Sequence, residues 1–443
     1  MERTEIATSI SGIKPCEARR FVGELVPTVL LVLAWLIICF LILSLIDPYG
    51  VIGWPQIAGF NAVKPLQSAN ARIYKPFALL KGDYNGIVLG ASRELRGIEP
   101  KSALLVGAGY RLYNFGVVDE RPYESEEIAE FAVNRMAIKT LIFDAEFTGY
   151  DADPFSAIGY LGPFYPKGSI LRWAINQYFR AAMSPRGLED SYTTVIASLQ
   201  RQRVIRHTPE GREVFPPEPP PDVPYDYRGA FNATLARYLN DLLPALAPQR
   251  ELWISQGFDH TPLRKMVELA ATHGIRLIAF VAADHALEME ALRRRGLWPL
   301  FEQWKRELVC VFHNAAATHP NADVTLWDFS GYNSITTQPV PRSDAPSVVM
   351  DYLDPVHYAP NLGDKILSTI LGLNEDTRVE NDFGVKLTIS NIDEHLAKIR
   401  NAQTRYEASH PDEMKWLASL DRSSPPPATL QTRPGRLDCG ARE

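Results

Sequence analysis

The stretch from Val26 to Ile46 limits what this chain can fold into more than any other part of the sequence. It contains no charged side chain, and about 20 apolar residues suffice to cross a bilayer as a helix. The alternative is a cleaved signal peptide, but its apolar region is shorter and ends in small residues. Here the run is longer and ends in Ser-Leu-Ile-Asp-Pro at residues 44–48. We therefore predict a retained transmembrane anchor over residues 26–46.

Basic residues are distributed unevenly around this run. Four Lys or Arg residues precede it, whereas Lys64 is the only one in the stretch that follows, up to Arg72. Positively charged flanks stay on the cytoplasmic side of a membrane. This predicts a single-pass inner-membrane protein with a cytoplasmic N-terminus (residues 1–25) and a main domain in the periplasm or outside the cell.

The cysteines do not suggest a disulfide framework. Cys16 is expected on the cytoplasmic side and Cys39 in the span, which leaves Cys310 and Cys439 outside. At most one intramolecular bridge is then possible. We expect none, because Cys310 lies in an apolar, helix-like run and Cys439 lies in a tail.

After a proline-punctuated connecting stretch at residues 47–84, apolar runs typical of buried strands alternate with amphipathic helical patterns. Strands are expected at 87–89, 111–116, 140–143, 275–282 and 324–329, and helices at 125–136, 261–274, 285–316 and 361–373. Strands that alternate with helices imply a parallel sheet covered on both faces. The pattern predicts a three-layer α/β/α domain with five parallel strands at residues 85–374.

More than a hundred residues separate the third and fourth expected strands, too many for an ordinary crossover. This insertion, at about 150–260, contains an aromatic loop at 160–165, a helical stretch at 191–204 and a proline run at 215–224. Such insertions become lids or substrate walls, or they are surface elaborations without a role in binding. The tail at 375–443 is expected to form one helix and then to be disordered.

Two short motifs carry the candidate chemistry. Ser92 follows Gly90-Ala91 just past the carboxyl end of the first strand, where open α/β sheets place reactive groups. Far away, Asp354-Pro355-Val356-His357 supplies a histidine that can take the serine proton and a carboxylate that can orient the histidine. The structural alternatives are a helix-capping serine, a surface histidine and an aspartate in an Asp-Pro turn.

With Gly-x-Ser after the first strand and Asp-x-x-His before the last helix, the chain resembles the SGNH/GDSL hydrolase superfamily. More narrowly, it is similar to the membrane-anchored envelope branch, which includes proteins of alginate O-acetylation and lipoteichoic-acid D-alanylation. The resemblance implies a flavodoxin-like fold and a Ser92-His357-Asp354 triad. It also implies that the backbone amides of Ser92 and Gly116, the latter within Asn114-Phe115-Gly116, donate to the oxyanion.

The chain departs from the family pattern at two positions. Ala91 stands where an aspartate usually precedes the serine. Glu146 stands at the strand end where the third family block has an asparagine, and an ionised carboxylate cannot donate a hydrogen bond. Both departures fit a branch specialised for transfer, or one that has lost activity.

Further polar residues follow the predicted strands and could line a glycan cleft. They are Asn114, Glu146, Asp284, His285 and Asp328. No Cys/His cluster has metal-ligand spacing, and no glycine-rich loop fits a dinucleotide or phosphate, so we expect neither a metal nor a cofactor. A formal net charge of -6 argues against nucleic acid as a partner.

The sequence thus predicts a membrane-anchored serine acyl-transfer enzyme, either an O-acetyltransferase or an esterase, that acts on an envelope or secreted polysaccharide. The substrate class comes only from the resemblance and the anchor. The alternative is a non-catalytic SGNH-like partner that helps a membrane-bound O-acyltransferase to modify a glycan.

Overall fold

The structure, a computed structural model, describes residues 15–150, 176, 184–215, 225–341, 350–373, 382–422 and 439. It divides into two compact units. We call Met1–Ile73 with Ser169–Val204 the N-terminal unit, and Tyr74–Gly168 with Ile205–Glu443 the sheet unit. The predicted aromatic loop at 160–165 and nearly all of the proline run lie outside the described residues.

Helix α1 (Pro15–Ile46) dominates the N-terminal unit. Its stretch Leu25–Ile46 is long and apolar enough to cross a membrane, which confirms the predicted apolar helix. The last carbonyl groups of a helix have no intrahelical donors. Here Asn61 Nδ2 donates to Leu45 O and Lys64 Nζ donates to Ile46 O, so side chains of the connecting stretch terminate the helix.

Short helices follow α1 in the stretch predicted as a connection. They are η1 (Ser68–Asn70) and α2 (Ala71–Lys81). Helix α7 (Pro185–Leu199) completes the described part of the N-terminal unit, with Ser184 as its N-cap, and packs against α1. Helix α7, which lies within the predicted insertion, therefore belongs to the same compact unit as the apolar helix.

The sheet unit is built on a mixed sheet of six strands. In spatial order these are β2 (Leu112–Asn114), β1 (Gly86–Leu89), β3 (Thr140–Asp144), β6 (Arg276–Val281), β7 (Val324–Asp328) and β8 (Val385–Lys386). All neighbours are parallel except β7 and β8, which are antiparallel. The prediction of a parallel sheet was right for most of the sheet, but the prediction of five strands was wrong. A two-residue strand such as β8 is too short to show an alternation in the sequence.

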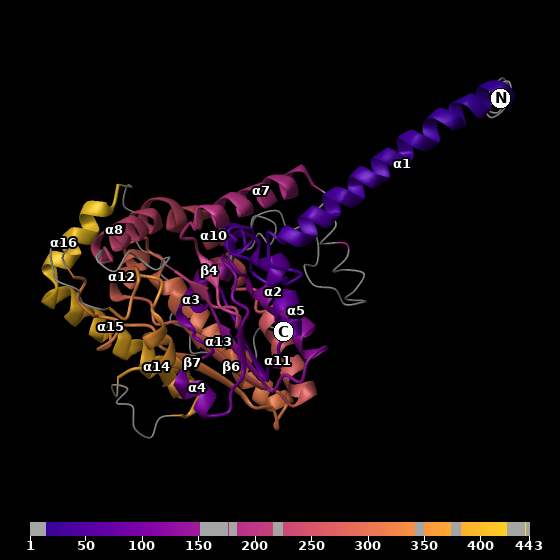
Figure 1. The fold of residues 1–443 in the computed structure, drawn as a ribbon. Helices are drawn as coiled ribbons and strands as arrows, with labels where there is room; N and C mark the ends of the chain where they lie inside the picture. Colours follow the sequence, from indigo (N-terminus) through magenta and orange to yellow (C-terminus); the bar gives the residue numbers. More distant parts are fainter. Residues whose placement is uncertain are drawn as a thin grey trace, which may run out of the picture. The chain divides into compact units, whose positions relative to one another are not determined.

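Helices cover both faces of this sheet. Helices α5 (Pro122–Val133), α11 (Thr261–His273) and α13 (Trp298–Thr318) pack next to one another and against the strands. Helices α3 (Ser92–Gly97) and α14 (Pro360–Leu371) pack on each other. Figure 1 shows α5 and α11 on one side of the strands and α14 on the other. Strands β1 and β3 are buried throughout, as expected where both faces are covered.

The long helix predicted at 285–316 is in fact two helices, α12 (Ala286–Arg294) and α13. The helical pattern is interrupted at Gly296, which lies between the two helices and has a φ of +67°, a conformation that favours glycine. The predicted end of α11 at Gly274 is confirmed.

The remaining described elements of the sheet unit are shorter or lie toward the C-terminus. They are α4 (Ala103–Gly107), η2 (Phe147–Tyr150), β4 (Arg206–His207), β5 (Glu213–Val214), α8 (Tyr227–Arg237), η3 (Tyr238–Leu242), α9 (Leu243–Ala245), α10 (Ala247–Gln256), α15 (Ile392–Ser409) and α16 (Pro411–Leu420). The tail contains β8 and α16 besides the one helix predicted there, and all three elements pack within the sheet unit. The last twenty or so residues, predicted to be disordered, lie outside the described residues except for Cys439.

The expectation that Cys310 and Cys439 stay apart was wrong. Cys310 in α13 forms a disulfide with Cys439, with the Cα atoms 5.1 Å apart. Asn314 Nδ2 also donates to Cys439 O at 3.1 Å, which holds this residue against the same helix. The two cysteines are 129 residues apart in sequence, so no local pattern could pair them.

Candidate active site

Ser92 is the first residue of α3 and follows the carboxyl end of β1. The turn between them depends on Gly90, whose φ is +151° and where a Cβ would lie 2.5 Å from Glu94 Oε2. Ala91 O then accepts the first helical hydrogen bond, from Leu95 N at 3.1 Å. A glycine and a small residue before Ser92 therefore have a steric reason.

Asp354 and His357 lie in a tight turn before α14. Asp354 Oδ1 accepts from the backbone N–H groups of Val356 and His357, each at 2.9 Å. The turn is closed by Leu353 N, which donates to His357 O at 2.8 Å. A short aspartate side chain that binds the backbone of the following residues is typical of such turns. The local sequence thus sets the geometry of this Asp-His pair.

Close helix contact brings this turn to Ser92. A Cβ at Gly97 in α3 would lie 2.1 Å from the Tyr358 ring, and one at Gly363 in α14 would lie 1.9 Å from Gly97 O. The two glycines therefore let the start of α14 approach α3 closely. Tyr358 Oη also donates to Glu94 Oε1 at 2.9 Å, which fixes the residue after His357 to α3.

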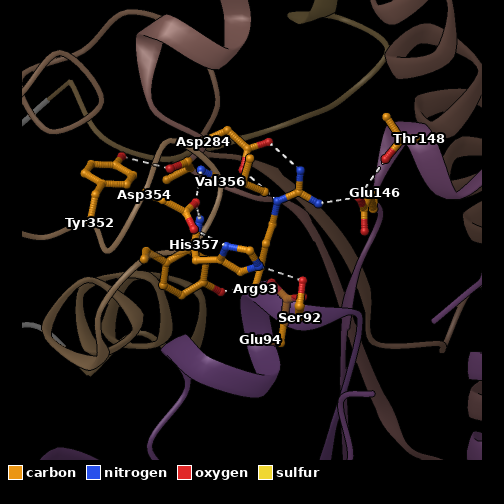
Figure 2. A network of polar contacts seen from close by, with 12 residues as sticks. Ser92, Arg93, Glu94, Glu146, Thr148, Asp284, Tyr352, Asp354, Val356 and His357 are labelled. Atoms are coloured by element: carbon orange, nitrogen blue, oxygen red, sulfur yellow. Dashed lines mark hydrogen bonds and ion pairs between the residues drawn. The ribbon is translucent and has the colours of Figure 1, made fainter. Parts of the chain in front are cut away.

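Ser92, His357 and Asp354 form one continuous line of hydrogen bonds (Figure 2). His357 Nδ1 lies 2.7 Å from Asp354 Oδ2, and His357 Nε2 lies 2.8 Å from Ser92 Oγ. An ionised carboxylate only accepts hydrogen bonds, so Nδ1 carries the proton and Nε2 is free to accept from the serine hydroxyl. Asp354 is 7% exposed, while Ser92 and His357 are partly exposed.

The protonation state of Asp354 suits this arrangement. Burial alone would raise its pKa, but the hydrogen bond and charge of His357 and the two backbone donors outweigh burial. The pKa of Asp354 therefore lies below its usual value, and the group is ionised at neutral pH.

Arg93, directly after Ser92, is the cation of a second, adjacent cluster. Its Nε and Nη2 donate to the two oxygens of Asp284 at 2.7 and 3.0 Å, and its Nη1 lies 2.7 Å from Glu146 Oε1. Burial would lower the pKa of Arg93, but the two carboxylates hold it well above its usual value. Figure 2 shows the guanidinium between Asp284 and Glu146.

More carboxyl groups surround Arg93 than one cation can neutralise. Burial raises the pKa of Asp284 to about 6, which still leaves it ionised at neutral pH, and it raises the pKa of Glu94 to about 8. Burial also raises the pKa of Asp144 and Glu288 well above the usual range. These last three groups are therefore protonated and neutral near pH 7.

A small pocket lies against this cluster. Its polar lining is Arg93, Asp144, Glu146, Thr148, Asp284 and Glu288, and Phe147 and Phe301 contribute apolar surface. The space open to the centres of water molecules is about 20 Å³, enough for roughly one or two waters. Both carboxyl oxygens of Asp144 are buried there without a partner in the described part of the chain.

The backbone N–H of Gly116, which was expected to donate to the oxyanion, already donates a hydrogen bond within the protein. Its N–H donates to Asn114 Oδ1 at 3.1 Å, and a Cβ at this position would lie 2.9 Å from Leu95 N. Asn114 is fully buried and also donates to Glu94 O and Ile98 O, at 2.6 and 2.9 Å. The Asn114 side chain thus links β2 to α3 through hydrogen bonds. The close contact with Leu95 N is enough to explain why residue 116 is a glycine.

The other predicted cleft residues are placed differently from one another. Glu146 and Asp284 join Arg93 next to Ser92, as described above. His285 is fully buried and caps α12, accepting from Leu287 N at 3.2 Å, and burial lowers its pKa to about 4. Asp328 is 1% exposed and pairs with Lys305 and His395 instead of facing a cleft.

Arg93 is the residue of this site that the sequence did not single out. A signal was present, because acidic residues follow two predicted strands, with Asp144 and Glu146 after one and Asp284 after the other. Carboxylates brought to one sheet edge require a cation or protonation. Arg93 is the basic residue next to the end of the first strand. The need for a cation near these carboxylates could therefore have identified Arg93 from the sequence.

Within the described residues, no group of three or more His, Cys, Asp or Glu side chains could hold a metal ion. A scan of protein-family models and a search of curated proteins found no match to this chain.

Proposed function

We propose that this protein is a membrane-anchored serine acyl-transfer enzyme of the SGNH type, which acts on ester groups of an envelope or secreted polysaccharide. The observation that carries the proposal is the line from Ser92 Oγ through the His357 ring to Asp354, with contacts of 2.8 and 2.7 Å. The order of the five parallel strands supports the fold assignment. Numbered along the chain it is 2-1-3-4-5, the order of flavodoxin-like sheets.

In the proposed reaction, Ser92 Oγ attacks the ester carbonyl carbon while His357 Nε2 takes its proton. Asp354 keeps the ring oriented and supports its positive charge. The C–O bond of the ester then breaks, and His357 returns the proton to the leaving alcohol. Water or a glycan hydroxyl attacks the acyl-serine in the second half-reaction, which gives hydrolysis or transfer respectively.

The Ser92 N–H is the remaining oxyanion donor of those suggested by the family resemblance, since Asn114 occupies the amide of Gly116. This arrangement also favours a second candidate, a non-catalytic partner of a membrane-bound O-acyltransferase. The close His357–Ser92 contact supports the enzyme, whereas the occupied amide and the Glu146–Arg93 pair support the partner.

The test is hydrolysis of an activated acetyl ester, 4-nitrophenyl acetate, by the purified full chain in detergent. The proposal predicts turnover that Ser92→Ala abolishes, and equal turnover by the variant would overturn it. No turnover by the wild type, with glycan acetylation only when a membrane acyltransferase is co-expressed, would establish the partner role instead.

We propose further that α1 anchors the chain in the cytoplasmic membrane, with the sheet unit in the periplasm or outside the cell. The uneven basic flanks support this orientation. The Cys310–Cys439 bridge also supports it, because disulfides persist in exported compartments. A reporter fused after Glu443 should be active only outside the cytoplasm. A soluble mature product that begins near Asp47 would show that α1 is a cleaved signal.

A further inference from the structure

The exposed apolar side chains of α7 form a stripe along one side of the helix. Leu188, Tyr192 and Leu199 are 39, 68 and 61% exposed. At 3.6 residues per turn these positions lie within about 40° of one another around the helix axis. An amphipathic helix of a soluble domain normally turns such a stripe toward the core.

The face that α7 turns inward is polar instead. Asp190, Thr194 and Ser198 are 7, 0 and 1% exposed. Asp190 Oδ2 accepts from Tyr49 Oη at 2.5 Å, and Ser198 Oγ accepts from Val63 N at 3.0 Å. These contacts fix α7 to the stretch that follows α1. The helix is therefore amphipathic in the inverted sense, with polar groups inside and apolar groups outside.

Helix α7 lies at the C-terminal end of the candidate membrane span, where it packs against α1 (Figure 1). Leu43 and Ile46 in the last turns of α1 are only 1 and 7% exposed, whereas Leu41 and Leu45 are each 53% exposed or more. The span that ends at Ile46 is about the length that crosses the hydrocarbon core. The contact with α1 thus brings α7 to the level where the chain leaves the bilayer.

Apolar exposure continues in the chain just beyond α1. Trp54 is 47% exposed and Ile57 is 55% exposed, and both follow Ile46 within the same compact unit. Tryptophan and tyrosine are enriched at the membrane–water boundary, where an apolar ring with a polar atom is stable. Trp54 and Tyr192 are exposed residues of the types found at this boundary.

We propose that α7 is a membrane-interface helix. Its exposed residues Leu188, Tyr192 and Leu199 contact the boundary between headgroups and acyl chains, beside the point where α1 leaves the bilayer. The stripe faces the lipid surface and not another protein, because α7 packs against the helix that is long and apolar enough to cross the membrane. This inference is independent of the acyl-transfer proposal.

The test uses spin labels on the full chain in vesicles of phosphatidylcholine and phosphatidylglycerol. Cys16 and Cys39 are replaced by alanine, and the Cys310–Cys439 bridge is kept. One label is placed at Tyr192→Cys or Leu199→Cys. The matched control is Gln200→Cys, which is exposed and lies about 100° around the helix from residue 199.

Accessibility to oxygen relative to a water-soluble nickel chelate reports membrane depth. The proposal predicts that this ratio is several-fold higher at residues 192 and 199 than at residue 200. Equal ratios at all three positions would overturn it, because the stripe would then face water. Exclusion of both reagents at 192 and 199 would also overturn it, because another protein surface would then cover the stripe.

Discussion

Among the described residues of the sheet unit, two aspartate–histidine pairs differ in what else they contact. Asp354 and His357 are 2.7 Å apart, and Asp328 and His395 are 2.8 Å apart. The first pair continues to a serine hydroxyl, since His357 Nε2 contacts Ser92. In the second pair it is the aspartate that has a further partner, because Lys305 Nζ lies 2.7 Å from the same oxygen, Asp328 Oδ2.

The difference shows that the third partner, not the pair itself, decides what an aspartate–histidine contact does. Asp354 contacts one side chain, that of His357, whose other ring nitrogen is directed at the Ser92 hydroxyl. Asp328 is held by Lys305, His395 and the backbone N–H of Ser330, which ties α13 and α15 to the end of β7. The same contact is therefore suited to proton transfer in one place and to cross-linking of the fold in the other.

The largest expected effect is that of Asp354→Asn on activity. An amide facing His357 Nδ1 donates a hydrogen bond, so the ring takes the other tautomer and Nε2 can no longer accept the Ser92 proton. In triads of this kind the loss in kcat is about 10⁴-fold. The measurement is kcat on an acetyl ester, with circular dichroism to show that the fold is kept. Retention of most of the rate would remove Asp354 from the mechanism.

Asp328→Asn is the matched variant, and we expect it to affect stability instead. It leaves the Lys305 side chain, which is 1% exposed, without its carboxylate. Breaking a buried ion pair costs about 3–5 kcal/mol. Urea unfolding should show this loss, while kcat at a temperature where the variant is folded should stay near the wild-type value. A rate loss as large as that of Asp354→Asn would erase the distinction between the pairs.

The pH dependence of the Asp328 network has a definite sign. Burial would raise the pKa of Asp328, but Lys305 and His395 outweigh burial and hold this pKa below its usual value. A depressed carboxyl pKa contributes stability that is present above the unfolded-state pKa, near 3.9, and is lost as the pH falls below it. The difference in unfolding free energy between wild type and Asp328→Asn should therefore shrink below about pH 4.

Glu94→Gln should change the pH dependence of stability with the opposite sign. Burial raises the pKa of Glu94 to about 8, so the folded state holds a proton that the unfolded state has released above about pH 4.5. Between these values the wild type should lose about 1.4 kcal/mol of stability per pH unit from this group. Glutamine has no such proton, so the variant should lack this slope in urea unfolding at pH 5, 6 and 7. Parallel profiles would show that Glu94 is ionised in the fold.

The strands and most of the helices around the site could be predicted from the sequence, because buried strands are continuously apolar and α11 and α14 have clear apolar faces and glycine ends. Residues 92, 354 and 357 were named for the same reason, since each lies at a strand end or in a turn with local signals. The role of Arg93 and the Cys310–Cys439 bridge were missed. The bridge depends on which distant segments meet, and no local pattern encodes that. For Arg93, the acidic residues at the strand ends were a signal that a cation is needed there, but its partners Asp284 and Glu146 come from distant strands.

The possible cleft residues show the same limit. Asp284, His285 and Asp328 were all predicted as possible cleft residues, because each lies at the end of a predicted strand. The structure separates them by their partners: a guanidinium for Asp284, a helix N-terminus for His285 and a buried ammonium for Asp328. A single sequence indicates the edge of the sheet, but the side chains that reach this edge from other elements decide each role.

The central claim is that His357 activates Ser92, and covalent labelling tests it most directly. The full chain is incubated with a fluorophosphonate, which reacts with activated serines, and the adduct is located by peptide mass spectrometry. We predict an adduct on Ser92 in the wild type and in Asp328→Asn, and none in His357→Ala. No adduct on Ser92 in the wild type, or undiminished labelling in His357→Ala, would contradict the claim.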